Sequence, residues 1–304
     1  MNNSPIISGL AVNLVTPFNA QGEIDFPALE KLVRRIRHSD VHCIFINASS
    51  SEASMLDQNE QDRVVEFVSE INDNDKMLVG GIPGGSTRSC VQRIASFDQH
   101  GLTAIYCDEP LPQASSPSGY IGHFRSIAQS APLPIIFEHK TGLLGTGAEE
   151  AILSLSKEQN IIGMVESTGD VALHGAIIRR KPESFSVMSG RDVMALPLMA
   201  LGIDGAVSTI ANAFPMECAR MMDQMVFGNF QDARETHHLL APLLRILESE
   251  GSPTGIKSLL NHFQMMDHLV RLPNTPVSDK MRGELYRALA ELPQTMVTPA
   301  LNPA

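Results

Sequence analysis

Eight short apolar segments alternate with helical patterns along this chain, and this alternation limits the possible folds more than any other feature. Short apolar runs separated by amphipathic patterns are typical of βα units around a parallel sheet. The expected strands are residues 9–16, 42–48, 77–82, 102–107, 134–138, 161–166, 185–189 and 205–210. The expected helices between them are residues 26–38, 58–72, 86–100, 117–130, 148–158, 170–180 and 192–201. Eight such units favour an α/β fold of the closed (β/α)8 TIM-barrel type over an open sheet.

The pattern changes after the eighth expected strand. Four helical segments follow with no strand between them, at residues 215–227, 230–250, 255–266 and 278–292. One of them is expected to close the barrel and the others to form a C-terminal helical extension. We therefore expect a barrel over residues 1–225, an extension over 226–292, and a disordered tail rich in Pro, Thr and Asn over 293–304.

Composition narrows the class of partner. The 304 residues are 43% hydrophobic, which suits one barrel domain with an extension, and 23 basic against 34 acidic residues give a net charge of −11. That charge disfavours nucleic acid and anionic membranes as partners. Four widely spaced cysteines form neither a disulfide framework nor a zinc pattern. With no leader-like N-terminus and no run of eighteen apolar residues, we expect a cytoplasmic protein that binds a small molecule.

Small and hydroxyl-bearing residues follow several of the expected strands. Ser49, Ser50 and Glu52 come after the second strand, and Gly190 comes after the seventh. A run of small hydroxyl residues at the end of a barrel strand can present backbone N–H groups and side-chain donors to a carboxylate. The alternative is a serine-rich loop that caps the next helix.

These motifs together resemble the dihydrodipicolinate synthase/N-acetylneuraminate lyase family over about residues 8 to 290. The similar segments are Thr-Pro-Phe at 16–18, Gly-x-Ile-Asp at 22–25, the serine motif at 49–52, Ser-Gly-x-Asp at 189–192 and Gly-Ala-Val-Ser at 205–208. The resemblance implies that Ser49, Ser50, Gly190 and Val207 bind the substrate, a 2-oxo acid or other small carboxylate. It also implies a homo-oligomer, a dimer or a tetramer built as a dimer of dimers.

The chain departs from the family at the positions of its chemistry. The family's Schiff-base lysine falls on Val165, and an imine with a 2-oxo acid requires a primary amine, which valine lacks. One catalytic tyrosine of the family falls on Glu138, and the tyrosine that relays protons across a subunit boundary falls on Pro112. A glutamate can replace a tyrosine as an acid or base only if burial raises its pKa.

Lys140 is the one lysine expected near the carboxyl ends of the strands. Glu138 and Lys140 share the inward parity of the fifth strand, so they are candidates for a catalytic acid and amine; the alternative is an ion pair in a loop. Metal-ligand residue types are also present, at Glu52, Glu138, His139, Glu166 and Asp192. Because His139 and Glu166 have the opposite parity to Glu138 and Val165, we expect no metal site, and we expect no cofactor.

Three functions therefore stay open from sequence alone. The chain could be a family member that has lost Schiff-base aldol chemistry and retains binding of a small carboxylate, or binds nothing. It could be a lyase with altered chemistry that uses Glu138 and Lys140. It could also be a non-catalytic structural or regulatory partner.

Overall fold

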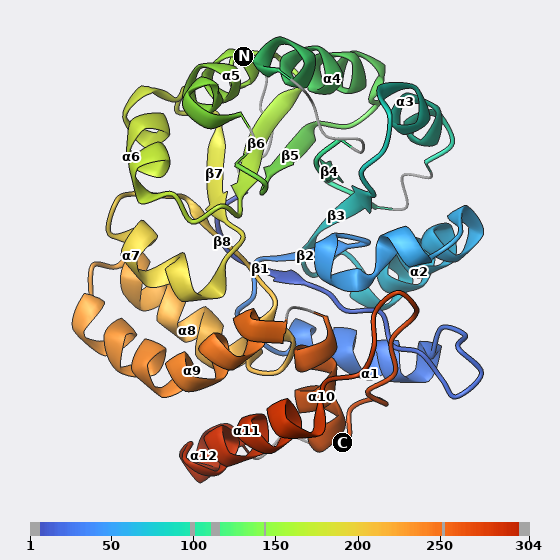
Figure 1. The fold of residues 1–304 in the computed structure, drawn as a ribbon, viewed down its shortest axis with the longest axis vertical. Helices are drawn as coiled ribbons and strands as arrows, with labels where there is room; N and C mark the ends of the chain where they lie inside the picture. Colours follow the sequence, from blue (N-terminus) through green and yellow to red (C-terminus); the bar gives the residue numbers. More distant parts are fainter. Residues whose placement is uncertain (1–6, 98–100, 111–115, 143, 251–252, 298–304) are drawn as a thin grey trace.

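The computed structural model describes residues 7–97, 101–110, 116–142, 144–250 and 253–297. Eight parallel strands close into a barrel in sequence order, and helices surround it (Figure 1). This is the expected (β/α)8 TIM barrel. The strands are β1 (Gly9–Asn13), β2 (Cys43–Ile46), β3 (Met77–Ile82), β4 (Ala104–Cys107), β5 (Ile135–His139), β6 (Ile161–Glu166), β7 (Ser186–Ser189) and β8 (Gly205–Ser208).

Side-chain alternation along the strands produces two separate apolar cores. One fills the barrel interior and includes Ala11, Phe45 and Tyr106. The other lies between the strands and the helices and includes Val12 and Ile44. Because neighbours along a strand point to opposite faces, the parity of a residue decides whether it faces the barrel interior or the helical layer.

Most helices of the barrel lie close to the expected ranges, but the third, expected over 86–100, ends at Ala95, and residues 98–100 lie outside the described chain. They are α1 (Phe26–Arg37), α2 (Gln58–Asn72), α3 (Thr87–Ala95), α4 (Pro117–Ser130), α5 (Ala148–Leu155), α6 (Val171–Arg180), α7 (Ala195–Met199) and α8 (Pro215–Val226). Asp25 and Asp57 cap α1 and α2 with side-chain oxygens that accept backbone N–H groups. The seventh helix is shorter than expected, because residues Asp192–Met194 form a separate 3-10 turn.

The C-terminal helices lie along one side of the barrel, as the orange and red elements of Figure 1 show. α8 packs against β1, and α9 (Phe230–Glu250) packs against α8; α10 (Thr254–His262) and α11 (Asp279–Ala290) follow. Part of the tail expected to be disordered, Gln294–Val297, is a short helix, α12, in which Met296 is buried. Residues 298–304 lie outside the described chain. No described helix is long and apolar enough to cross a membrane.

Candidate functional site

A small pocket opens at the carboxyl end of the barrel. It is lined by residues from every strand or strand end except β3: Asn13, Ala48, Ser49, Tyr106, Glu138, Val165, Gly190 and Val207. Its volume is about 10 Å³, so it is a small cavity. The barrel's own side chains therefore fill most of the space at which TIM-barrel enzymes bind their substrates.

Val165 and Glu138 occupy neighbouring positions in this pocket. They are partners in the register between β5 and β6, and each is almost completely buried, at 2% and 3% exposure. Both side chains face the barrel interior, as their parity predicts. The position at which the family resemblance places an amine therefore holds an isopropyl group next to a carboxyl group.

Glu138 is the centre of a hydrogen-bond cluster. Its Oε2 accepts the hydroxyl proton of Tyr106 from β4, and its Oε1 accepts that of Ser167, which follows β6, at 2.8 Å. Burial, together with the nearby Asp108 carboxylate, raises the pKa of Glu138 to about 7, against the opposing effects of Lys140 and Tyr106. Near neutral pH the group can thus both donate and accept a proton.

Lys140 lies at the rim of the same cluster. Its Nζ forms an ion pair with Asp108 and lies 3.4 Å from Glu138 Oε2. Burial lowers the pKa of Lys140, but the two carboxylates outweigh that effect, and the pKa lies above its ordinary value. The ammonium form is therefore stabilised, which disfavours a role as an amine nucleophile.

Ser49 and Ser50, the expected carboxylate-binding residues, already bind groups of the protein itself. The side-chain amide of Asn13 donates to Ser49 Oγ at 2.9 Å and accepts the backbone N–H of Ser50 at 3.2 Å. The hydroxyl of Ser50 lies 2.8 Å from that of Thr209. Asn13 and Ser49 therefore line the pocket side by side, and the amide of Asn13 already occupies hydrogen-bonding groups of both serines.

Gly190 and Val207, the other two expected substrate-binding residues, also line the pocket. A Cβ atom at Gly190 would lie 2.0 Å from Ser167 Oγ and 2.9 Å from Val165 Cγ1. Gly190 is thus needed for Ser167 to reach Glu138. Pro112, at the position of the second family tyrosine, lies outside the described residues.

His139 and Glu166 point away from the pocket, as their parity predicts. His139 Nδ1 lies 3.1 Å from Glu109 Oε1, and His174 Nε2 lies 3.1 Å from Glu166 Oε2, so two buried imidazole–carboxylate pairs lie in the helical layer. Across the described ranges, no group of three or more His, Cys, Asp and Glu side chains could hold a metal ion.

Glu52 points away from the pocket and binds the C-terminal extension. It forms a fully buried ion pair with Lys257 of α10 at 2.5 Å and accepts the backbone N–H of Arg271 at 2.9 Å. Burial lowers the pKa of Lys257 to about 8, although Glu52 opposes that shift. Phe18 lies under this pair, with its ring centroid 4.2 Å from Lys257 Nζ. Glu52 therefore joins the loop after β2 to the extension.

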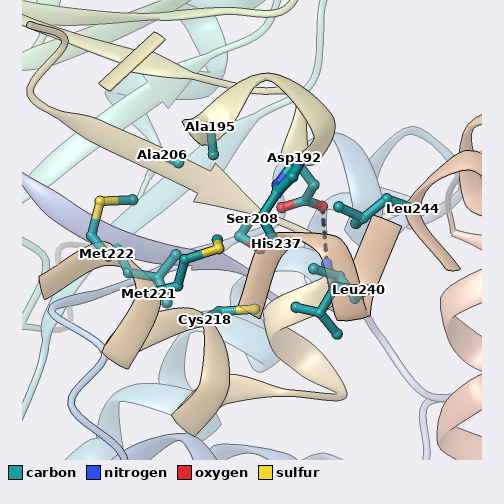
Figure 2. Close-up of a pocket in the computed structure, with 12 residues that line it drawn as sticks. Asp192, Ala195, Ala206, Ser208, Cys218, Met221, Met222, His237, Leu240 and Leu244 are labelled. Atoms are coloured by element: carbon teal, nitrogen blue, oxygen red, sulfur yellow. Dashed lines mark hydrogen bonds between the residues drawn. The ribbon is translucent and has the colours of Figure 1, made fainter. Parts of the chain in front are cut away.

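Asp192 lines a second cavity, which is bordered by β8, α8 and α9 (Figure 2). Its carboxylate accepts the backbone N–H groups of Thr209 and Ile210 at 3.0 and 3.1 Å. Most of the other residues lining the cavity are apolar, including Met221 and Leu240. Asp192 thus fixes the loop after β8 and does not reach the barrel mouth.

Sequence reasoning missed several members of the site: Asn13, Tyr106, Asp108 and Ser167. Strand parity could have found Tyr106, because it is two residues beyond inward Ala104. A polar residue in an otherwise apolar strand was the signal for Asn13. Nothing in the sequence links Glu52 to Lys257, which are 205 residues apart.

Comparison with known proteins agrees with this architecture. A model of the dihydrodipicolinate synthetase family matches residues 6–292. The 4-hydroxy-tetrahydrodipicolinate synthase of Parabacteroides distasonis is 32% identical, covering 94% of this chain and 97% of the relative, and that of Azobacteroides pseudotrichonymphae is 31% identical, covering 93% and 97%. The crystal structure of dihydrodipicolinate synthase from Aquifex aeolicus superimposes with a TM-score of 0.88 at 28% identity, covering 97% of this chain and all of that one.

The fold and the small pocket at its carboxyl end define a (β/α)8-barrel protein with a cavity at the carboxyl ends of its strands. Within that class, the chain belongs to the dihydrodipicolinate synthetase family.

Proposed function

We propose that this protein is a family member that binds a small molecule at the barrel mouth without forming an imine. The observation that carries the proposal is the pairing of Val165 with Glu138 in the pocket. The nearest amine, that of Lys140, is held as an ammonium by Asp108 and Glu138. Neither position offers the neutral primary amine that attacks a 2-oxo acid.

Trapping with borohydride tests the absence of an imine. We expect the mass of the protein to stay unchanged after incubation with pyruvate and borohydride, since reduction fixes only an imine. An adduct on any lysine contradicts the proposal, and an adduct on Lys140 would assign that residue as the nucleophile.

A thermal-shift panel of 2-oxo acids, hydroxy acids, amides and amines tests binding. Binding to the native state alone raises the free energy of unfolding by RT ln(1 + [L]/Kd), so a true ligand raises Tm in a concentration-dependent way. A wild-type protein that responds to no member of the panel would favour the third possibility, a structural or regulatory partner.

A second candidate function is a lyase that uses Glu138 as its acid or base. The pKa of about 7 favours it, and the hydroxyl groups of Tyr106 and Ser167 fix the position of the carboxyl group. In such a reaction Glu138 would take a proton from a carbon next to a carbonyl group. The Lys140 ammonium would stabilise the negative charge that develops on the carbonyl oxygen, and so would act as a cation.

Exchange of ligand protons with solvent deuterium, followed by NMR, tests this second candidate directly. Wild-type protein should catalyse exchange in a ligand from the panel, and the rate should fall by at least a hundredfold in Glu138→Gln, within the range of about 10²–10⁴ for general acid–base catalysis. Glu158→Gln is the matched control, because Glu158 lies in a surface ion pair with Arg125. Equal exchange in wild type and Glu138→Gln would exclude Glu138 as the base.

A further inference from the structure

The side chain of Asn13 makes hydrogen bonds to the serine motif, residues 49–52, at the mouth of the barrel. It lies at the end of β1 with 5% of its surface exposed, and it lines the pocket with Glu138 and Val165. Its Oδ1 accepts the backbone N–H of Ser50, while its Nδ2 donates to the hydroxyl oxygen of Ser49. A carboxamide has the same planar shape as a carboxylate and nearly the same size.

These contacts involve the same groups that a carboxylate would use. A carboxylate at the serine motif would accept from the Ser50 N–H and from the Ser49 hydroxyl. Asn13 Oδ1 already accepts the Ser50 N–H, and Asn13 Nδ2 donates to Ser49 Oγ. The Ser49 hydroxyl also contacts Tyr106. An incoming carboxylate would have to displace Asn13, and the displaced amide would need new partners inside a buried site.

Charge acts in the same direction as the hydrogen bonds. The titratable groups around Glu138 are Tyr106, Asp108 and Lys140, and the ammonium of Lys140 is shared between two carboxylates. An ionised ligand at the serine motif would face Glu138 without a cation of its own among the residues that line the pocket.

We propose that Asn13 is a specificity-determining residue: its carboxamide occupies the carboxylate position of the serine motif, so the native pocket rejects small carboxylates and selects uncharged or basic ligands. This inference rests on the proposed small-molecule site and defines its ligand class. It changes the expectation from the family resemblance, in which Ser49 and Ser50 bind the carboxylate of a 2-oxo acid.

Two substitutions separate the effect of space from that of hydrogen bonding. Asn13→Ala removes the carboxamide and opens the space, while Asn13→Leu releases the same hydrogen bonds but keeps the space filled. The probes are acetate and pyruvate, with acetamide as the uncharged equivalent of acetate. Binding is measured by titration calorimetry and by the ligand-dependent change in Tm.

We expect Asn13→Ala to bind acetate and pyruvate at least tenfold more tightly than wild type or Asn13→Leu, and to prefer acetate to acetamide. The factor corresponds to one hydrogen bond to a charged group. Asn72→Ala is the control for loss of a buried amide, because Asn72 binds the backbone of Lys76 far from the pocket, and it should gain no affinity. If Asn13→Ala does not fold, Asn13→Ser replaces it, with the same expected gain.

Three results would overturn the proposal. The first is that wild type binds acetate as tightly as Asn13→Ala. The second is that Asn13→Leu and Asn13→Ala gain equal affinity for acetate. The third is that neither Asn13→Ala nor Asn13→Ser binds acetate at all. None of these affects the proposed small-molecule site if wild type responds to an uncharged or basic member of the panel. If wild type responds to nothing, the proposed function itself fails.

Discussion

Glu138 of β5 and Val165 of β6 are register partners whose side chains meet inside the barrel mouth. The pair places a carboxyl group of raised pKa next to the position that holds an amine in the family pattern. Any attempt to restore imine chemistry at residue 165 must therefore take account of Glu138.

Val165→Lys alone is expected to give no synthase or lyase activity. A carboxylate beside the new amine would hold it as an ammonium, and no tyrosine would stand at positions 138 and 112. Pyruvate with borohydride, read by mass spectrometry, should therefore give little or no adduct in this variant.

The double variant Val165→Lys with Glu138→Gln is the comparison for that experiment. Removal of the carboxylate lowers the pKa of the introduced lysine, so we expect more adduct at neutral pH than in the single variant. Efficient turnover by Val165→Lys alone would show that Glu138 and the missing tyrosines do not limit the reaction.

Glu138 is expected to make stability depend on pH. Its pKa rises from an ordinary 4.5 to about 7 on folding, so between these values the native state binds more protons than the unfolded state. The free energy of unfolding should then decrease as pH rises through this window, by up to about 3 kcal/mol.

Glu138→Gln, which resembles the protonated form, should lack this decrease. Urea unfolding at about pH 5 and about pH 8 measures it: the variant should match wild type at the lower pH and exceed it at the higher. Glu158→Gln should follow wild type at both. The opposite result is a free energy of unfolding of wild type that increases from about pH 5 to about pH 8 relative to that of Glu138→Gln. It would show that the Glu138 carboxyl group of the native state is ionised at both pH values.

Lys257→Met is expected to be strongly destabilising. It leaves Glu52 fully buried without its cation, and removing one member of a buried ion pair costs about 3–5 kcal/mol. Chemical denaturation measures the loss. Glu30→Gln, in the exposed Glu30–Arg34 pair, should change stability by less than about 1 kcal/mol.

Combining Lys257→Met with Glu52→Gln tests whether the charge is the cause. The neutral amide can still accept the backbone N–H of Arg271, so part of the lost stability should return. If the double variant is no more stable than Lys257→Met, the loss comes from packing around Phe18 instead.

We expect the protein to form at least a dimer in solution. The family resemblance implies a homo-oligomer, and apolar area at Leu111 and Pro112, which lie outside the described residues, would favour pairing. The charge of −11 opposes association, and physiological salt screens it over roughly 8 Å. Light scattering at micromolar concentration and moderate salt should therefore give a mass above that of one 33.0 kDa chain. A mass of one chain would contradict this expectation.

Periodicity and parity, both local properties of the sequence, determined the barrel and the direction of its strand residues. Eight apolar segments predicted the closed sheet, and alternation placed Glu138 and Val165 inside and His139 and Glu166 outside. The sequence alone also shows that residue 165 is a valine, which has no amine.

Only the tertiary structure decided what these side chains contact. Barrel closure brings Asn13 to the serine motif and Tyr106 to Glu138, and it joins Glu52 to Lys257 across 205 residues. The pKa of Glu138 also depends on that environment, because burial and the Asp108 carboxylate act through space. The spacing of apolar residues along the sequence determines the repeated strand–helix units. Hydrogen bonds and desolvation depend instead on distances between side chains that are set only when the barrel closes.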